Sequence, residues 1–396
     1  MNDSKEQAYL YWLHCVPGIG DASLRLLVKE FGSAGAVYRA PVRELETALG
    51  RGALGETGRK RAEKIEESRR DGSVLENYRQ LEAKGIRMVS LWDREYPGRL
   101  KKITNPPAVL YYLGALPAEE RLALAIIGAR ECSDYGSYIA GVFGERIASC
   151  GVNIISGMAR GIDGISQMEA LRAGGSTYAV LGCGVDICYP ADNRRLYERI
   201  QERGGILSPF PPGTPPAKNL FPLRNKIVAG LSDAVLVVEA RQKSGTWITV
   251  DMALEQGKDV YAVPGRITDR LSDGCNLLIR QGAGIALAPG DILAELSVLG
   301  NRKGERKERC VRHGRSRAAS KKTDENMPSE ELSGQERDRS GLLAFLDVNP
   351  SSCDEILERA GRAGVKLELS KLMAGLVELC LAGKARQTGG NYFALK

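Results

Sequence analysis

LALAIIGARECSDYGSYIAGVFGERIASCGVNIISG, residues 122–157, is the stretch of sequence that decides the fold. It contains two short apolar runs, 122–127 and 152–155, and each is typical of a buried parallel strand. Between them, Ser133 is a helix start signal. The apolar residues that follow it have helical spacing: Ile139, Val142, Phe143 and Ile147. A strand, a helix and a second strand form a βαβ unit, and such units build parallel sheets.

Further apolar runs extend this pattern. Those that are β-rich and bounded by Gly, Ser or Pro, as buried strands are, lie at 177–181, 234–238 and 260–263. Residues 86–91 and 108–113 predict extra strands that widen the sheet at one edge. We therefore predict an α/β fold over residues 76–297, with an extended Rossmann-like, doubly wound sheet and helices on both faces.

The residues before this core, 1–75, have a helical pattern with short loops. The turn VPGIG, residues 16–20, precedes apolar residues at helical spacing, which indicates a helix-hairpin-helix or SAM-like domain. In such a hairpin, backbone N–H groups at the next helix N-terminus can bind a DNA phosphate. The alternative is an ordinary turn between two helices.

Residues 338–396 predict a winged helix. Apolar periodicity marks its helices at 342–346, 356–360 and 369–381, and residues 384–395 are typical of a hairpin. The helix that would read DNA, 369–381, carries only Lys371 as a basic residue. A protein-binding or structural role is therefore as consistent with its sequence as DNA reading.

The positive charge of the chain is concentrated in one segment. The 396 residues are 43% apolar and 27% charged, with a formal net charge of +7. Residues 301–322 hold ten Lys or Arg and two Glu, a local charge of +8. A basic run without apolar periodicity predicts a disordered linker over 298–337, which either binds an anionic polymer or serves only as a tether.

The composition argues against several classes of protein. Nine cysteines without a C-x-x-C pair disfavour a disulfide framework and a structural zinc site. Two histidines, His14 and His313, make a Ser-His-Asp triad or a metal centre improbable, and no P-loop motif occurs. The polar start and the short apolar runs predict neither a signal peptide nor a membrane span, so we expect a cytoplasmic protein.

Ligands of a doubly wound sheet bind outside the carboxyl ends of its strands, so the loops after the strands are the candidate site. These loops are rich in Gly, hydroxyl groups and cations, which suits a polyanion. Their candidate DNA-binding residues are Arg130, Ser133, Ser156, Gly157, Arg160, Gly182, Gly184, Lys243, Ser244 and Gly245. For each cation the alternative is a surface salt bridge. None of the loops completes G-x-G-x-x-G, which disfavours a dinucleotide cofactor.

A proline-rich segment, 208–226, places an aromatic residue beside cations. It predicts a rigid loop with the further candidates Lys218, Phe221, Arg224, Asn225 and Lys226. An exposed Phe next to Lys and Arg holds single-stranded DNA by stacking an unpaired base while the cations neutralise phosphates. The alternative is a buried Phe221 that plugs the sheet edge.

The order of these motifs resembles the DNA processing protein A family, also called DprA or Smf. The resemblance rests on IGAR (127–130), SGMARGID (156–163), LGCGVD (181–186), FPLRNK (221–226), KSGT (243–246) and AVPG (262–265). It implies a core that binds single-stranded DNA, without catalysis, cofactor or metal. The DNA contacts it implies are Arg130, the turn at Ser156 and Gly157, the Gly182 loop, Lys218, Phe221, Arg224, Asn225 and Lys226.

The resemblance also implies partners. It implies a homodimer that helps to load RecA recombinase onto DNA taken up in natural transformation, and a single-strand-binding protein is a further candidate partner. We predict the dimer interface late in the core, at the apolar residues Leu277, Leu278, Ile279 and Ile285.

Two positions depart from the commonest family pattern. Lys226 stands where Arg is frequent, which keeps the charge but not the bidentate fork, and Thr246-Trp247 replaces a pair of small residues.

An alternative from another class is a related Rossmann-type hydrolase that cleaves nucleotide-derived phosphates. Such enzymes resemble this chain in the Gly245-Thr246 turn, with Glu255 as the downstream acid. The chain lacks their P-G-G-x-G-T loop and has RQKSGT at 241–246 instead.

Overall fold

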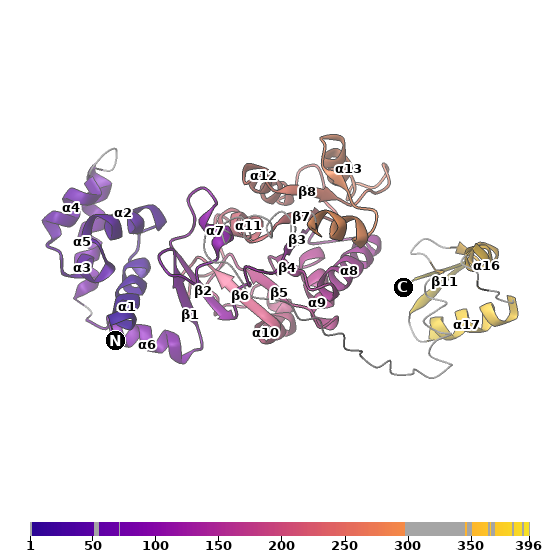
Figure 1. The fold of residues 1–396 in the computed structure, drawn as a ribbon, viewed down its shortest axis with the longest axis horizontal. Coiled ribbons are helices and arrows are strands. Elements are labelled where there is room, and N and C mark those ends of the chain that lie inside the picture. Colours follow the sequence, from indigo (N-terminus) through magenta and orange to yellow (C-terminus); the bar gives the residue numbers. More distant parts are fainter. Residues whose placement is uncertain are drawn as a thin grey trace, which may run out of the picture. The chain divides into compact units, whose positions relative to one another are not determined.

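The computed structural model of the chain describes residues 2–50, 55–70, 72–297, 345–346, 351–362, 365, 369–381, 384–389 and 392–395. The chain divides into two compact units, Met1–Lys307 and Glu308–Lys396 (Figure 1). The predicted linker, 298–337, lies outside the described residues. Within the described ranges, no helix is both long enough and apolar enough to cross a membrane.

The first unit begins with the helices α1 (Asn2–Cys15), α2 (Asp21–Phe31), α3 (Ala34–Arg39), α4 (Val42–Gly50), α5 (Gly55–Arg69) and α6 (Val74–Ala83). In the first turn of α2, the carboxylate of Asp21 accepts a hydrogen bond from the backbone N–H of Ala108 at 2.7 Å. An acidic side chain therefore occupies this helix start and joins it to the segment before β2. The helix-hairpin-helix interpretation of residues 16–20 stays a prediction.

A sheet of nine strands follows in the same unit (Figure 1). Its strands are β1 (Arg87–Ser90), β2 (Val109–Gly114), β3 (Ala123–Ile127), β4 (Asn153–Ser156), β5 (Thr177–Val180), β6 (Gly204–Ser208), β7 (Ala234–Val237), β8 (Asp259–Ala262) and β9 (Gly284–Ile285). The spatial order is β1-β2-β6-β5-β4-β3-β7-β8-β9. In this order, the seven neighbouring strands β6, β5, β4, β3, β7, β8 and β9 pair in parallel. β1 and β2 pair antiparallel and extend one edge.

The sheet confirms the predicted α/β class and the strands predicted from apolar runs, including the two at the edge. Two strands were not predicted. β6 begins with Gly204 and Gly205, residues that are depleted in strands, and β9 has only two residues. β6 matters because it joins the parallel strands to the antiparallel edge.

Helices cover both faces of the sheet. They are α7 (Gly98–Lys101), α8 (Asp134–Ser149), α9 (Ile162–Arg172), α10 (Arg194–Arg203), α11 (Leu220–Leu231), α12 (Thr246–Glu255) and α13 (Asp273–Arg280). Alternate residues of β3 point to opposite faces: Ala125 packs in one core with α11 and α12, and Leu124 packs in another with α8. Every residue of β3 is buried, as a strand covered on both faces requires.

The predicted loop over 208–226 is wrong in its last part, because Leu220 begins helix α11. Pro222 suggested a loop, but proline is tolerated in the first turn of a helix, where backbone N–H groups lack intrahelical partners.

The chain reverses its direction of winding at β3. It runs from β3 outward through β4, β5 and β6, and then returns to place β7, β8 and β9 on the other side of β3. Connections on the two sides therefore diverge at the carboxyl ends of β3 and β7, which is where such sheets form a ligand crevice.

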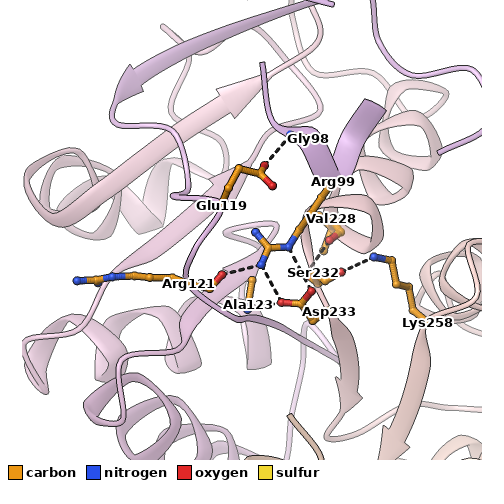
Figure 2. Close-up of polar contacts among 9 residues, drawn as sticks. All are labelled: Gly98, Arg99, Glu119, Arg121, Ala123, Val228, Ser232, Asp233 and Lys258. Carbon is orange, nitrogen blue, oxygen red and sulfur yellow. Dashed lines mark hydrogen bonds and ion pairs between the residues drawn. The ribbon is translucent and has the colours of Figure 1, made fainter. Parts of the chain in front are cut away.

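A buried ion pair joins the amino ends of the same two strands (Figure 2). Arg99 of α7 donates from Nη2 and Nε to Asp233, at 2.9 and 3.2 Å, and Asp233 also accepts from the backbone N–H of Ala123 at 2.9 Å. Arg99 further donates to the carbonyl oxygen of Arg121 at 2.6 Å. The pair thus ties α7 to the starts of β3 and β7.

The second unit has its own small core. Its described elements are β10 (Ser351–Ser352), α16 (Cys353–Arg362), α17 (Leu369–Leu381), β11 (Ala385–Gly389) and β12 (Tyr392–Leu395). Buried residues such as Ile356, Leu376 and Phe393 join the helices to the β11–β12 hairpin. The helices predicted at 356–360 and 369–381 and the terminal hairpin are confirmed, whereas most of the helix predicted at 342–346 lies outside the described residues.

Replacing Asp233 by Ala should destabilise the first unit, because Arg99 would keep a buried charge without its counter-ion. We expect a loss of about 3 to 5 kcal/mol in the free energy of unfolding. Urea denaturation followed by tryptophan fluorescence measures it, since Trp12, Trp92 and Trp247 all lie in this unit.

The control is Glu63→Ala, which removes an exposed ion pair with Arg59. This variant should lower the free energy of unfolding by less than about 1 kcal/mol. Equal losses in the two variants would contradict a special contribution of the buried pair.

Candidate nucleic-acid interface

A pocket of about 620 Å³ opens at the crevice between β3 and β7. Its walls come from the loops after β3, β4, β5, β6 and β7 and from the helices α11 and α12. The predicted residues that line it are Arg130, Gly157, Lys218, Phe221, Arg224, Asn225, Ser244 and Gly245. Those that do not line it are Ser133, Ser156, Arg160, Gly182, Gly184, Lys226 and Lys243.

Phe221 is the aromatic centre of the pocket wall. Its half-buried ring has the guanidinium carbons of Arg130 and Arg224 at 5.6 and 5.7 Å from the ring centroid, within the range of cation–π attraction. A Cβ added at Gly182 would lie 2.8 Å from Cδ1 of Phe221, so the glycine lets the ring approach the loop after β5. Phe221 is therefore neither a fully buried plug nor a free ring.

Arg224 is buried, and its guanidinium bonds to the protein itself. Nη1 donates to the carbonyl oxygens of Gly157 at 2.6 Å and Val180 at 2.8 Å, which joins the carboxyl ends of β4 and β5. Nε is buried without a hydrogen-bond partner among the described residues. A phosphate contact by Arg224 stays a prediction, and the structure adds a supporting role that the sequence did not indicate.

A buried carboxylate accompanies this cation. Asp163 accepts a hydrogen bond from the backbone N–H of Gly157 at 3.1 Å. Burial raises the pKa of Asp163, and the charge of Arg224 acts in the opposite direction. The two groups stabilise each other beneath the loop after β4.

The loop after β4 is held in an unusual conformation. Met158 has φ of 53°, in the left-handed region that costs a non-glycine residue about 1 to 2 kcal/mol. The side-chain oxygen of Gln167 accepts a hydrogen bond from the backbone N–H of Met158 at 3.1 Å. Nδ2 of Asn193 donates to the carbonyl oxygens of Met158 and Ala159 at 2.9 and 3.2 Å. These side chains maintain the loop that lines the pocket with Gly157 and Ala159.

The hydroxyl groups predicted for the site are used inside the fold. Ser133 caps α8, donates to the buried Glu239 and accepts from the backbone N–H of Gly136 at 3.0 Å. Ser156 donates to the carbonyl oxygen of Ile126 at 2.6 Å. Both side chains therefore position strand ends, although sequence reasoning selected them as ligand groups.

Besides Arg224, the predicted cations form three groups. Arg130 and Lys218 are exposed in the pocket wall, and Lys243 is exposed but does not line the pocket. Lys226 instead donates to the carbonyl oxygen of Asn105 at 3.2 Å, and burial lowers the pKa of Lys226. Arg160 is paired with Asp192 at 2.6 Å on the surface beside the pocket, which is the salt bridge that sequence reasoning left open.

Among the pocket-lining residues that the sequence analysis did not select, Arg241 and Tyr189 have side chains suited to binding DNA. Arg241 lies in the same loop as Lys243 and, like Lys243, is a cation in a loop that follows a strand. Tyr189 lies three residues after the LGCGVD motif (181–186), and no local pattern marks it as a pocket residue. The tertiary structure brings its ring beside Phe221 through the loop after β5.

The hydrolase alternative depended on Glu255. Gly245 and Thr246 line the pocket, but Glu255 is the exposed last residue of α12 and does not. Within the described ranges, no group of three or more His, Cys, Asp or Glu could hold a metal ion.

The fold and the site together define an α/β protein with a crevice lined by cations and an aromatic ring. The family model of DNA recombination-mediator protein A matches residues 87–297. The chain is 32% identical to the protein Smf of Synechocystis over 98% of both chains. The chain belongs to the DNA recombination-mediator protein A family.

Two further comparisons agree with this assignment. The chain is 42% identical to the DNA processing protein DprA of Streptococcus pneumoniae, over 52% of this chain and 73% of that protein. A crystal structure of DprA from Streptococcus pneumoniae matches with a TM-score of 0.61 and 32% identity, over 72% of this chain and 96% of the other. The relationship thus extends from the sequence to the three-dimensional fold.

Gly157→Ala should distort the pocket, because the added Cβ would lie 1.7 Å from Nη1 of Arg224. We expect a loss of about 1 to 3 kcal/mol in the free energy of unfolding as the guanidinium is displaced. Urea denaturation with tryptophan fluorescence checks this. Gly245→Ala is the control, since that pocket glycine has open space around a Cβ and should change stability by less than about 0.5 kcal/mol. Equal stability of the Gly157→Ala variant and the parent would refute the close approach.

Proposed function

We propose that this protein binds single-stranded DNA in the crevice, protects incoming DNA and helps to load RecA recombinase during natural transformation. The observation that carries the proposal is the half-buried ring of Phe221 beside Arg130, in a pocket that also has Lys218 in its wall. An aromatic face with cations around it suits a strand whose bases are unpaired, because the ring stacks a base while the cations meet phosphates. Membership of the family, whose relatives are named DNA processing proteins, supports the same role.

Each cation has a defined part in the proposal. Arg130 and Lys218 neutralise phosphates directly, since both are exposed. Arg224 adds positive charge from its buried position in the pocket wall, and its guanidinium holds the ends of β4 and β5. Lys226 contributes a phosphate contact only if it leaves Asn105, to which it is bonded. Asn225, Ser244 and Gly245 also line the pocket.

The proposal assigns binding and no catalysis or cofactor to this pocket. The exposed position of Glu255, at the far end of α12 from the pocket, supports binding over hydrolysis. RecA and a single-strand-binding protein are the proposed protein partners, and the cytoplasm is the proposed location.

The flanking regions complete the proposed organisation. A helix-hairpin-helix or SAM-like domain spans 1–75, the DNA-binding core 76–297, a basic linker 298–337 and a winged helix 338–396. The helices α16 and α17 followed by the β11–β12 hairpin support the winged helix, and the helical content of residues 2–83 supports the first domain.

The DNA affinity should depend on salt through the exposed cations. For single strands, log K falls with log salt by about 0.7 per phosphate contacted. Arg130→Ala and Lys218→Ala should therefore each weaken binding and flatten the slope by about 0.7, and the double variant by about 1.4. Fluorescence anisotropy with labelled oligothymidylate at several salt concentrations measures both quantities.

The control is Arg146→Ala, which removes an exposed arginine from the last turn of α8, away from the pocket. It should leave the slope unchanged. If Arg130→Ala and Lys218→Ala keep both the affinity and the slope of the parent, the crevice is not the DNA site.

We also propose a homodimer through the β9 edge. Leu278 is buried in the core and is not available as an interface residue. Ile285 is 51% exposed on the edge strand, and Leu287 is 76% exposed beside it. The variant Ile285→Asp with Leu287→Asp should be a monomer in sedimentation velocity at micromolar concentration, because charges would be buried in the interface. Leu75→Asp, on α6, is the control and should leave the dimer intact. A monomeric parent would contradict the proposal.

A further inference from the structure

Tyr189 is an exposed aromatic residue in the pocket wall, and nothing in the fold accounts for its exposure. It lies in the loop after β5, lines the pocket and is 42% exposed. Its ring centroid is 5.9 Å from that of Phe221, with 38° between the ring planes. Within the part of the chain that the structure describes, its hydroxyl group makes no hydrogen bond. The ring thus packs against Phe221 on one part and leaves another part exposed to solvent.

The loop that carries Tyr189 is held by several contacts. Asn193 donates to the carbonyl oxygens of Met158 and Ala159, and Asp192 pairs with Arg160. These contacts tie the Tyr189 loop to the loop after β4, which lines the same pocket. Because these contacts hold the loop against the loop after β4, Tyr189 is held beside Phe221 before any ligand binds, and little conformational entropy is lost when it stacks.

Other groups already surround the Phe221 ring, so a second base would need another ring to stack on. Arg130, Arg224 and the backbone at Gly182 already lie around the Phe221 ring. The exposed part of Tyr189 is open to the pocket beside it. The rings come from separate segments, one from the loop after β5 and one from α11, so their spacing is set by the tertiary structure.

We propose that Tyr189 is a second base-stacking residue, which holds the nucleobase next to the one at Phe221. This inference rests on the proposed function and deepens it. The two ring planes are inclined by 38°, so bases stacked on the two rings would also be inclined to each other. Neighbouring bases of a duplex are stacked nearly parallel, whereas a single strand allows its bases to tilt and separate. The pair of rings therefore selects for unpaired, splayed bases in addition to negative charge.

Tyr189→Ala should weaken binding of oligothymidylate by about 5- to 160-fold, the effect of losing one base–aromatic stack. The salt slope should stay the same, because no charge is removed. Tyr189→Phe should bind like the parent, since it keeps the ring and loses only the hydroxyl group. Fluorescence anisotropy across a salt series gives the affinity and the slope for each variant.

A control oligonucleotide and a control variant separate the loss of stacking from a general loss of structure. An oligonucleotide of the same length made of abasic sites has the phosphates without the bases, and Tyr189→Ala should bind it as the parent does. Tyr138→Ala removes a tyrosine of matched exposure, 41%, from α8 outside the pocket, and should change neither affinity. Equal losses for the two oligonucleotides, or unchanged binding of oligothymidylate by Tyr189→Ala, would overturn the inference.

The outcomes also separate this inference from the proposed function. If the parent protein binds neither oligonucleotide, the proposed function fails. If the parent binds with a slope that depends on Arg130, and Tyr189→Ala binds like the parent, only the role of Tyr189 fails.

Discussion

The buried guanidinium of Arg224 is the constraint on which the pocket depends. An arginine keeps its charge in a protein, so burial requires that its surroundings satisfy it. The carbonyl oxygens of Gly157 and Val180 and the nearby carboxylate of Asp163 do so. Because the two carbonyl oxygens lie at the carboxyl ends of β4 and β5, satisfying one charge also sets the positions of two loops and of the first turn of α11, which carries Phe221.

Polar side chains around the crevice divide into those that shape it and those that remain available to a ligand. Ser133, Ser156 and Arg224 bond to the protein, whereas Arg130 and Lys218 are exposed. The strand pair at the centre is held at both ends. Arg99 and Asp233 join β3 and β7 at their amino ends, and Ser133 and Glu239 join the segments that follow their carboxyl ends. We expect a crevice held in this way to lose little binding free energy in being ordered.

Much of the fold could be predicted from the sequence, because buried strands and helix starts depend on local patterns. The run 123–127 is apolar throughout since both of its faces are covered, and Ser133 caps α8 as its position suggested. The collection of Gly-rich loops at one edge followed from the parallel order of the strands. The short or Gly-initiated strands β6 and β9 and the start of α11 at Leu220 were not predictable in this way, because their local signals are weak or contradictory.

The sequence by itself determined the class of fold, which loops form the candidate site, and the presence of cations near an aromatic residue. Only the tertiary structure decided which cations face the pocket. Arg224 and Lys226 are two positions apart on α11, and at 3.6 residues per turn such residues point about 200° apart. One is therefore buried in the pocket wall and the other bonds to Asn105. Likewise, Tyr189 and Phe221 are adjacent only because the loop after β5 and the start of α11 meet, a contact that no local pattern encodes.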